Sequence, residues 1–170
     1  QLCELAQAIL GTQVVVLKDK LIYKWPNTSG YGAHRDEPYF RISGVPGNRM
    51  VSVYIAIDPA NSLNGAIEFY PSLRDTPLAA PEHEPRDIHP DSLKKTKSVF
   101  PDLRPGDVLI FDGLIPHLSG FNMSDSPRRM YTVTYADASY EKCQTTYYRA
   151  RYQQLTEERK EVVEDDFVME

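Results

Sequence analysis

The sequence predicts a mainly β domain, built as a sandwich or a barrel. Short runs rich in β-branched and aromatic residues recur from residue 14 to residue 135. Turns that contain proline and glycine separate these runs. Amphipathic helical patterns occur only near the two ends of the chain. Many short strands joined by such turns are typical of an all-β sandwich or barrel.

The composition is that of one globular domain. The chain has 170 residues, of which 41% are hydrophobic and 25% are charged. We therefore expect residues 1–170 to form a single domain. The net charge of −5 argues against a nucleic-acid-binding surface, because the phosphate backbone requires a local excess of lysine and arginine.

Cysteine content and hydropathy indicate the compartment. The two cysteines, Cys3 and Cys143, provide neither a disulfide framework nor a cysteine-rich zinc pattern. We therefore expect a reducing location, the cytoplasm. No run approaches the roughly 18 apolar residues that span a bilayer, so no contact with a membrane is expected.

The first half of the chain begins with a short helix and continues with extended structure. Apolar residues recur at helical spacing from Leu2 to Ile9, and Gly11 is a suitable C-terminal stop. Residues 14–17 and 21–25 predict two strands, which a charged turn separates. A break at residues 26–30 leads into a further extended stretch at residues 31–40.

The second half contains four expected strands, a long loop and a final helix. The strands are expected at residues 50–57, 66–70, 108–111 and 128–135. Residues 71–105 are rich in proline and lack periodicity, which predicts a long surface excursion. Tyr148, Tyr152 and Leu155 lie at helical spacing before a charged tail.

The stretch around His34 contains the most informative chemistry. Side chains at positions i and i+2 of a strand point to the same face, so His34 and Asp36 can converge on one point. A second imidazole would complete the three-ligand face that non-haem Fe(II) oxygenases use. Taken alone, the pair is a weak signal, because His-x-Asp occurs by chance in many chains and more often marks two solvated polar residues.

Five pieces of sequence, in a fixed order, resemble the phytanoyl-CoA dioxygenase family of Fe(II)- and 2-oxoglutarate-dependent oxygenases. They are Leu21-Ile-Tyr-Lys-Trp-Pro26, Tyr31-Gly-Ala-His34-Arg-Asp36, Asn64-Gly65-Ala-Ile-Glu-Phe-Tyr-Pro71, Arg104-Pro-Gly-Asp107, and His117-Leu-Ser119-Gly-Phe-Asn122 with Pro127-Arg128-Arg129. The resemblance implies a double-stranded β-helix core, the jelly-roll or cupin-like fold, with flanking helices. Part of the family's N-terminal helical region is expected to be missing.

The resemblance also implies roles for individual residues. His34, Asp36 and His117 are expected to hold Fe(II), and Arg128 to pair with the far carboxylate of the co-substrate 2-oxoglutarate. Ser119 is expected to bind the co-substrate as well. Chemistry supports these residue types, because three ligands leave positions for a chelating 2-oxo acid and O2, and a guanidinium fork matches a carboxylate. Thr132, on the face of Arg128, is a further hydroxyl for the co-substrate.

The implied activity is hydroxylation of an unactivated carbon of a small-molecule substrate, with decarboxylation of 2-oxoglutarate to succinate and CO2. The carboxylate at Asp36 favours hydroxylation over halogenation, because it fills the coordination position that a halide needs. The alternative is a non-catalytic jelly-roll module that binds a metal or ligand. Arg128 and the complete set of motifs favour the enzyme.

Two departures from the family pattern concern the loop at Pro71-Ser-Leu-Arg74 and the residue between the first two ligands. The family often has Pro-Gly-Ser-His at the first position and Gln at the second, where this chain has Arg35. Arg35, Arg41 and Lys24 near the ligand stretch suggest a substrate with an acidic group.

Several residues keep alternative interpretations. Lys24 is either a second cation for a bound acid or a solvated strand residue, and Arg129 is expected to form a surface ion pair. His83 and His89 are expected to be exposed. Three tyrosines near the ligand stretch are candidates to line a pocket: Tyr23, Tyr31 and Tyr39.

Overall fold

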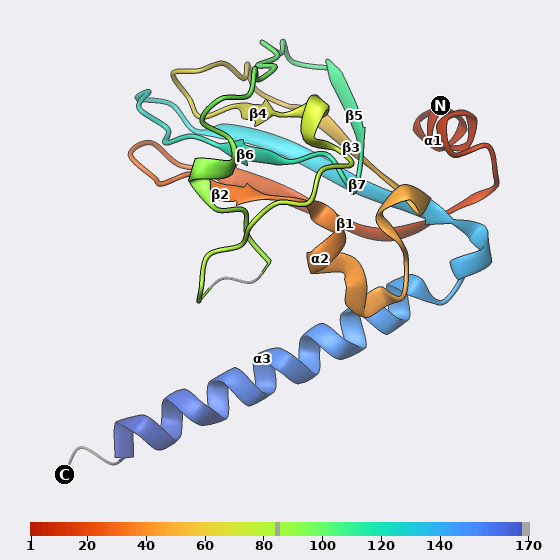
Figure 1. Cartoon of the computed structure of the whole chain (residues 1–170), viewed down its shortest axis with the longest axis vertical. Coiled ribbons are helices and arrows are strands. Elements are labelled where there is room, and N and C mark those ends of the chain that lie inside the picture. The colour runs from red at the N-terminus through yellow and green to blue at the C-terminus, as the bar shows by residue number, and fades with distance from the viewer. Residues whose placement is uncertain (84–85, 168–170) are drawn as a thin grey trace.

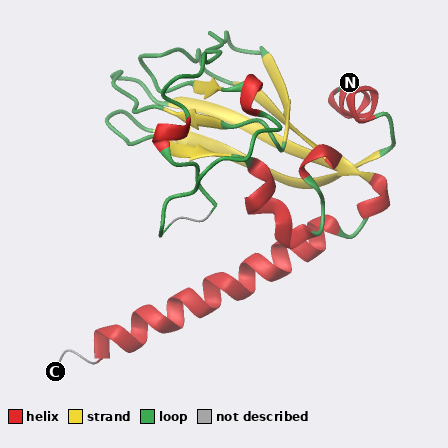
Figure 2. Ribbon diagram, viewed as in Figure 1, coloured by secondary structure: helices red, strands yellow, loops and turns green. Residues whose placement is uncertain are grey.

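Two antiparallel sheets that pack face to face form the body of the protein (Figures 1 and 2). The computed structural model describes residues 1–83 and 86–167, with side chains of the last helix placed up to Glu157. The larger sheet has the order β1 (Val14–Lys24), β7 (Arg128–Asp137), β3 (Met50–Ala56) and β5 (Val108–Asp112). The smaller sheet has the order β2 (Tyr31–His34), β6 (His117–Ser119) and β4 (Ile67–Phe69). The predicted mainly β jelly roll is confirmed.

The core between the sheets is apolar and aromatic. Both sheets contribute to one buried cluster, which consists of Tyr54, Ile67, Phe69, Phe111 and Met130. The rings of Tyr54 and Phe69 each lie 4.9 Å from the ring of Phe111. Such aromatic pairs add to the stabilisation that burial alone provides. The cluster sets the spacing of the two sheets beside the candidate site.

The predicted N-terminal helix is present as α1 (Leu2–Leu10) and packs on the larger sheet. Ala6 is fully buried in this contact. Gly11 ends the helix in the left-handed conformation with φ 68°, and its N–H donates to the Gln7 carbonyl at 2.8 Å. A glycine is suited to this position because it has no Cβ to clash in the left-handed region.

The prediction of two strands separated by a charged turn at residues 18–20 is wrong. Residues 14–24 form the single strand β1, which pairs with β7 along its whole length and has a bulge between Val16 and Lys18. The charged residues are accommodated because they alternate across the sheet. Asp19 accepts a hydrogen bond from the Tyr131 hydroxyl at 2.7 Å, and Lys20 lines the internal cavity.

The extended stretch predicted for residues 31–40 ends early. Strand β2 stops at His34, and Asp36 begins the short helix α2 (Asp36–Phe40). The expectation that helices occur only near the chain ends is therefore wrong, as is the expectation that strand alternation brings His34 and Asp36 to one face. Pro38 lies in the first turn of α2, where proline is tolerated.

The proline-rich segment at residues 71–105 is only partly the surface excursion that was predicted. Ile88 and Leu93 are buried against Ala33 and Tyr70 on the outer face of the smaller sheet. The Ile88 N–H donates to the Ala33 carbonyl at 2.6 Å. The segment therefore covers the smaller sheet at the strand that contains His34.

The predicted C-terminal helix is α3 (Cys143–Phe167), which extends away from the sheets in Figure 1. Its first turns pack on the body through Cys143 and Tyr147. The Lys18 ammonium donates to the Tyr147 hydroxyl at 2.7 Å. Tyr148, Tyr152 and Leu155 are exposed. In the described part of the chain, no helix is both long and apolar enough to cross a membrane.

Candidate metal centre and anion pocket

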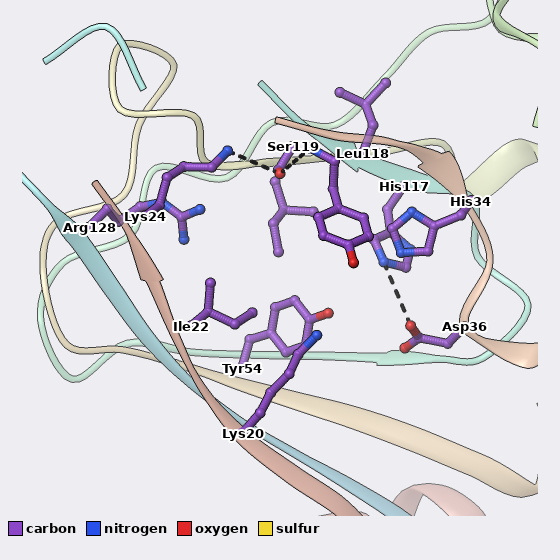
Figure 3. Close-up of a pocket in the computed structure, with 12 residues that line it drawn as sticks. Lys20, Ile22, Lys24, His34, Asp36, Tyr54, His117, Leu118, Ser119 and Arg128 are labelled. Atoms are coloured by element: carbon purple, nitrogen blue, oxygen red, sulfur yellow. Dashed lines mark hydrogen bonds and ion pairs between the residues drawn. The ribbon is translucent and has the colours of Figure 1, made fainter. Parts of the chain in front are cut away.

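Strand pairing brings His34 and His117 together. The two residues face each other in the register of β2 and β6, and their ring centroids lie 4.3 Å apart. Asp36 approaches from the start of α2 (Figure 3). One ligand atom from each of the three residues lies within 4.8 Å of the others. Two imidazoles and one carboxylate make up the ligand set of the facial triad.

Hydrogen bonds fix which imidazole nitrogen faces the centre. The Nδ1 of His34 lies 2.7 Å from the Gly32 carbonyl, and the Nδ1 of His117 lies 3.0 Å from the Ile115 carbonyl. Each Nδ1 therefore donates to a carbonyl, and Nε2 is the nitrogen of each ring that is left to bind a metal. Metal-bound histidines commonly have this arrangement.

The Nε2 of His117 has no hydrogen-bond partner. Among the described residues it is the one fully buried side-chain nitrogen or oxygen atom without one. Burial lowers the pKa of His117 to about 4, so the imidazole is neutral at neutral pH. Its 3.9 Å contact with Asp36 Oδ1 is consequently not an ion pair. A buried lone pair aimed at a carboxylate oxygen fits a bound cation between them.

A buried hydroxyl orients Asp36. The Ser52 hydroxyl, on β3, donates to Asp36 Oδ2 at 2.6 Å and lies 3.1 Å from the Thr134 hydroxyl on β7. Ser52 is 1% exposed. Because Oδ2 is bound in this way, Oδ1 is the oxygen that faces His117. Sequence reasoning did not identify Ser52, since a serine in an apolar strand carries no local signal of its partner.

Two cations lie at the other end of the same cavity (Figure 3). Arg128 is 2% exposed and donates to the carbonyls of Gly65 at 3.0 Å and Asn64 at 3.3 Å. Within the part of the chain that the structure describes, no carboxylate pairs with Arg128. Lys24 lies directly opposite Arg128 in the β1–β7 register. Burial, followed by the charge of Arg128, lowers the pKa of Lys24 to about 8.

Ser119 connects the cation end of the cavity to the smaller sheet. Its hydroxyl accepts from the Lys24 ammonium at 3.1 Å and from the Tyr31 N–H at 3.1 Å. Lys24 also donates to the Gly120 and Gly65 carbonyls. Lys24 is therefore buried, and the interpretation as a solvated strand residue is wrong.

The structure places the remaining predicted residues as follows. Thr132 is buried, and its hydroxyl lies 3.4 Å from the Lys20 carbonyl, outside the cavity lining. Tyr31 lines the cavity, whereas Tyr39 donates to Asp87 and Tyr23 packs on Trp25.

Arg129 forms the expected ion pair, with two nitrogens 2.8 Å from Asp58 oxygens. His83 and His89 are exposed, as predicted.

Arg35 and Arg41 do not face the cavity, which removes two of the cations on which an acidic substrate was predicted. The Arg35 guanidinium donates to the carbonyls of Leu114, Leu73 and Thr76 at 2.6–2.8 Å. Arg41 pairs with Glu37 on the surface. Arg35 therefore anchors the loop that follows β4.

Five cavity residues were given no role from the sequence: Lys20, Ile22, Tyr54, Ile67 and Leu118. The available signal was the alternation of Lys20, Ile22 and Lys24, which places them on one face of β1. The charges at residues 18–20 favour a turn in the sequence and so obscure this alternation.

Known proteins resemble this chain in sequence and in fold. The methylphosphonate hydroxylase of Gimesia maris is 30% identical over 138 residues, which cover 76% of this chain and 48% of that protein. The 2-aminoethylphosphonate dioxygenase of the uncultured bacterium HF130_AEPn_1 is 25% identical over 160 residues, which cover 94% of this chain and 60% of that protein. The chain thus spans about half the length of these relatives.

A solved structure supports the fold, and a family match supports the motifs. EctD from S. alaskensis, solved with 2-oxoglutarate and 5-hydroxyectoine, superimposes with a TM-score of 0.73 at 24% identity, over 82% of this chain and 50% of that one. The sequence pattern of the family described as "Phytanoyl-CoA dioxygenase (PhyH)" matches residues 1–130, which include His34, Asp36, His117 and Arg128. The chain belongs to the phytanoyl-CoA dioxygenase family.

Proposed function

We propose that this chain contains the active site of an Fe(II)- and 2-oxoglutarate-dependent dioxygenase that hydroxylates an unactivated carbon of a small molecule. The observation that carries the proposal is the unpartnered, buried Nε2 of His117, which converges with His34 and Asp36. Two neutral imidazoles and a carboxylate suit Fe(II) and leave coordination positions for other ligands.

The cation end of the cavity supports 2-oxoglutarate as the co-substrate. Lys24 and Arg128 are like charges on opposite positions of adjacent strands, an arrangement that is unfavourable without a counter-ion. No acidic side chain in the described residues supplies one. A carboxylate between them would accept bidentate hydrogen bonds from Arg128 and a further bond from Lys24 or Ser119. We assign this end to the 5-carboxylate of 2-oxoglutarate.

The chain's own residues position the reactants and shield them. His34, Asp36 and His117 would hold the iron, while Arg128, Lys24 and Ser119 would set the direction of the co-substrate in the cavity. Ile22, Ile67 and Leu118 provide apolar walls between the two ends. Bound iron would supply the oxidation of a substrate C–H bond to C–OH by O2, coupled to decarboxylation of 2-oxoglutarate to succinate and CO2.

Relatives support a small-molecule substrate. Two of them are named after methylphosphonate and 2-aminoethylphosphonate. We extend only the class, a small molecule, to this chain. A reducing, cytoplasmic location and a single domain over residues 1–170 also stay predictions.

Metal binding and co-substrate turnover test the proposal together. We expect the purified chain to bind one Fe(II) and to release succinate from 2-oxoglutarate. His117→Ala should abolish both while the fold is retained. Arg128→Ala should weaken 2-oxoglutarate binding by about 2–5 kcal/mol, because a partly desolvated carboxylate loses its bidentate partner.

Arg129→Ala is the matched control, because Arg129 points outward to Asp58. It should leave 2-oxoglutarate binding unchanged. Stoichiometric iron binding by a variant with alanine at all three ligand positions would overturn the metal site. Iron binding without any succinate release would favour the non-catalytic module.

A further inference from the structure

One cation in the cavity has no assigned partner. Lys20 lies two positions before Ile22 and four before Lys24, so the three side chains share one face of β1. Figure 3 shows the Lys20 side chain pointing into the cavity from the larger sheet. Among the described residues, its ammonium forms no hydrogen bond or ion pair. Lys20 is still accessible to solvent, so a ligand can reach it.

Lys20 belongs to the metal end of the cavity. Its charge acts on Asp36 and His117, whereas the charge of Arg128 acts on Lys24 at the other end. Burial and the neighbouring Lys18 lower the pKa of Lys20, and Asp36 opposes that shift. The Lys18 ammonium already donates a hydrogen bond to the Tyr147 hydroxyl. Lys20 is therefore placed beside the reaction centre and outside the pocket assigned to the 5-carboxylate.

Tyr54 offers a second unsatisfied donor in the same region. Its side chain points into the cavity in Figure 3, and its hydroxyl has no hydrogen-bond acceptor among the described residues. Burial, followed by the charge of Asp36, raises its pKa well above 10 against the opposing charge of Arg128, so the hydroxyl stays protonated and lies between the two ends of the cavity. An ammonium and a hydroxyl that both donate into one cavity are suited to an anionic oxygen.

The charge balance of the loaded site favours an anion beside Lys20. With Fe(II) at the triad and 2-oxoglutarate between iron and Arg128, Asp36 and the co-substrate would carry three negative charges, against four positive charges on the metal, Arg128 and protonated Lys24. Lys20 then adds a positive charge that no group in the described cavity compensates. Lys20 remains exposed to solvent, so this positive charge is available to attract an anionic ligand into the site.

We propose that Lys20, together with the Tyr54 hydroxyl, binds an anionic oxygen of the primary substrate, which is therefore a small carboxylate or phosphonate. This inference rests on the proposed function and deepens it by naming the substrate class. The sequence suggested an acidic substrate because of Arg35 and Arg41, but both arginines bind other groups. Lys20 and Tyr54 now support the same substrate class.

Anion binding to the loaded protein tests the inference. The protein is first saturated with Mn(II) and 2-oxoglutarate without oxygen, and both affinities are recorded. Methylphosphonate and acetate are then titrated separately by calorimetry. We expect at least one probe to bind, and Lys20→Met to weaken that binding at least about tenfold, the cost of a charged hydrogen bond. The probe that binds more tightly identifies the anion class.

Matched variants separate the outcomes. Lys20→Arg should retain most of the anion binding, and Lys18→Met, which removes the same charge two residues away on β1, should not affect it. In Lys20→Met, binding of metal and 2-oxoglutarate should remain. Failure of both probes to bind the loaded protein, an unchanged probe affinity in Lys20→Met, or an equal loss of 2-oxoglutarate binding would each overturn the inference. Failure of the proposed function would appear earlier, as absent metal or 2-oxoglutarate binding in the unmodified protein.

Discussion

Lys24 carries a charge that pH can control, because its pKa lies close to neutral pH. Its pKa of about 8 in the free protein results first from burial and then from Arg128. A bound carboxylate favours the protonated amine, so the pKa of Lys24 rises when 2-oxoglutarate binds. Below pH 8 the ammonium is already formed. Above that pH, binding must take up a proton, and affinity falls as the pH rises.

We therefore expect 2-oxoglutarate, titrated into the Mn(II) protein without oxygen, to bind about tenfold more weakly at about pH 9 than at about pH 7. Calorimetry in two buffers of different ionisation enthalpy would also detect the proton uptake. Lys24→Arg should remove this dependence, since a guanidinium stays charged over the range. An affinity that is equally pH-dependent in Lys24→Arg would exclude Lys24 as its source.

At the scale of elements, the position of Asp36 depends on a contact between β3 and α2. Asp36 begins a five-residue helix whose N-cap, Arg35, makes no side-chain cap hydrogen bond. The bond from Ser52 therefore supplies the orientation that strand geometry does not. Ser52→Ala should lower Mn(II) affinity by about 10–100-fold, as outer hydrogen-bond partners of metal ligands usually do.

Equilibrium dialysis with Mn(II) measures this loss directly. Ser43→Ala is a suitable control, because it also removes a buried hydroxyl, one that donates to the Phe40 carbonyl instead of a ligand. Thermal unfolding should show similar stability for the two variants. Equal metal affinities in the two variants would mean that Ser52 has only a packing role.

The strands that were predicted well are those whose own residues prefer extended structure. Residues 50–56 and 128–137 are rich in β-branched and aromatic side chains, and both form strands close to the expected bounds. The charged residues 18–20 resemble a turn in sequence. They form a strand because they pair with β7 and because Lys20 lines the cavity, and both partners lie far away in the sequence. Helix α2 carries no capping signal, so tertiary context decides its conformation.

The same distinction applies to the candidate site. His34, Asp36, His117, Arg128 and Ser119 were identified because motifs retain their order and spacing along the chain. Ser52, Tyr54 and Lys20 were not predicted because they come near the candidate site only when β1 and β3 face the smaller sheet. Their local sequence would look the same in any strand.

At the scale of the whole molecule, the candidate site joins the two sheets. His34 and His117 come from the smaller sheet, and Lys24 and Arg128 from the larger one. A metal held by the two histidines and a co-substrate held by Lys24 and Arg128 would together link the two sheets. At free ligand about 100-fold above its dissociation constant, binding should add about 2.7 kcal/mol to the stability, which raises Tm by about 5–10 °C in a chain of this size.

Thermal unfolding with Mn(II), with and without 2-oxoglutarate, measures that shift. The part due to 2-oxoglutarate should disappear in Arg128→Ala and persist in Arg129→Ala. A shift of the same size in both variants would show that the co-substrate stabilises the protein from some other place.

Gly65 allows a close backbone contact at the cation end of the cavity. It has φ +67°, and a Cβ at this position would lie 2.4 Å from the Gly120 carbonyl oxygen and 2.9 Å from the Lys24 nitrogen. The loops before β4 and after β6 therefore meet through their backbones behind Arg128. Backbone cannot retreat by a change of rotamer, as a side chain can. The distance between the triad and the cation pair is consequently fixed, and it limits the length of the carbon chain that fits between them. In the proposed binding mode, a 2-oxo diacid with one more methylene, such as 2-oxoadipate, would lose either its contact with the metal or its pairing with Arg128.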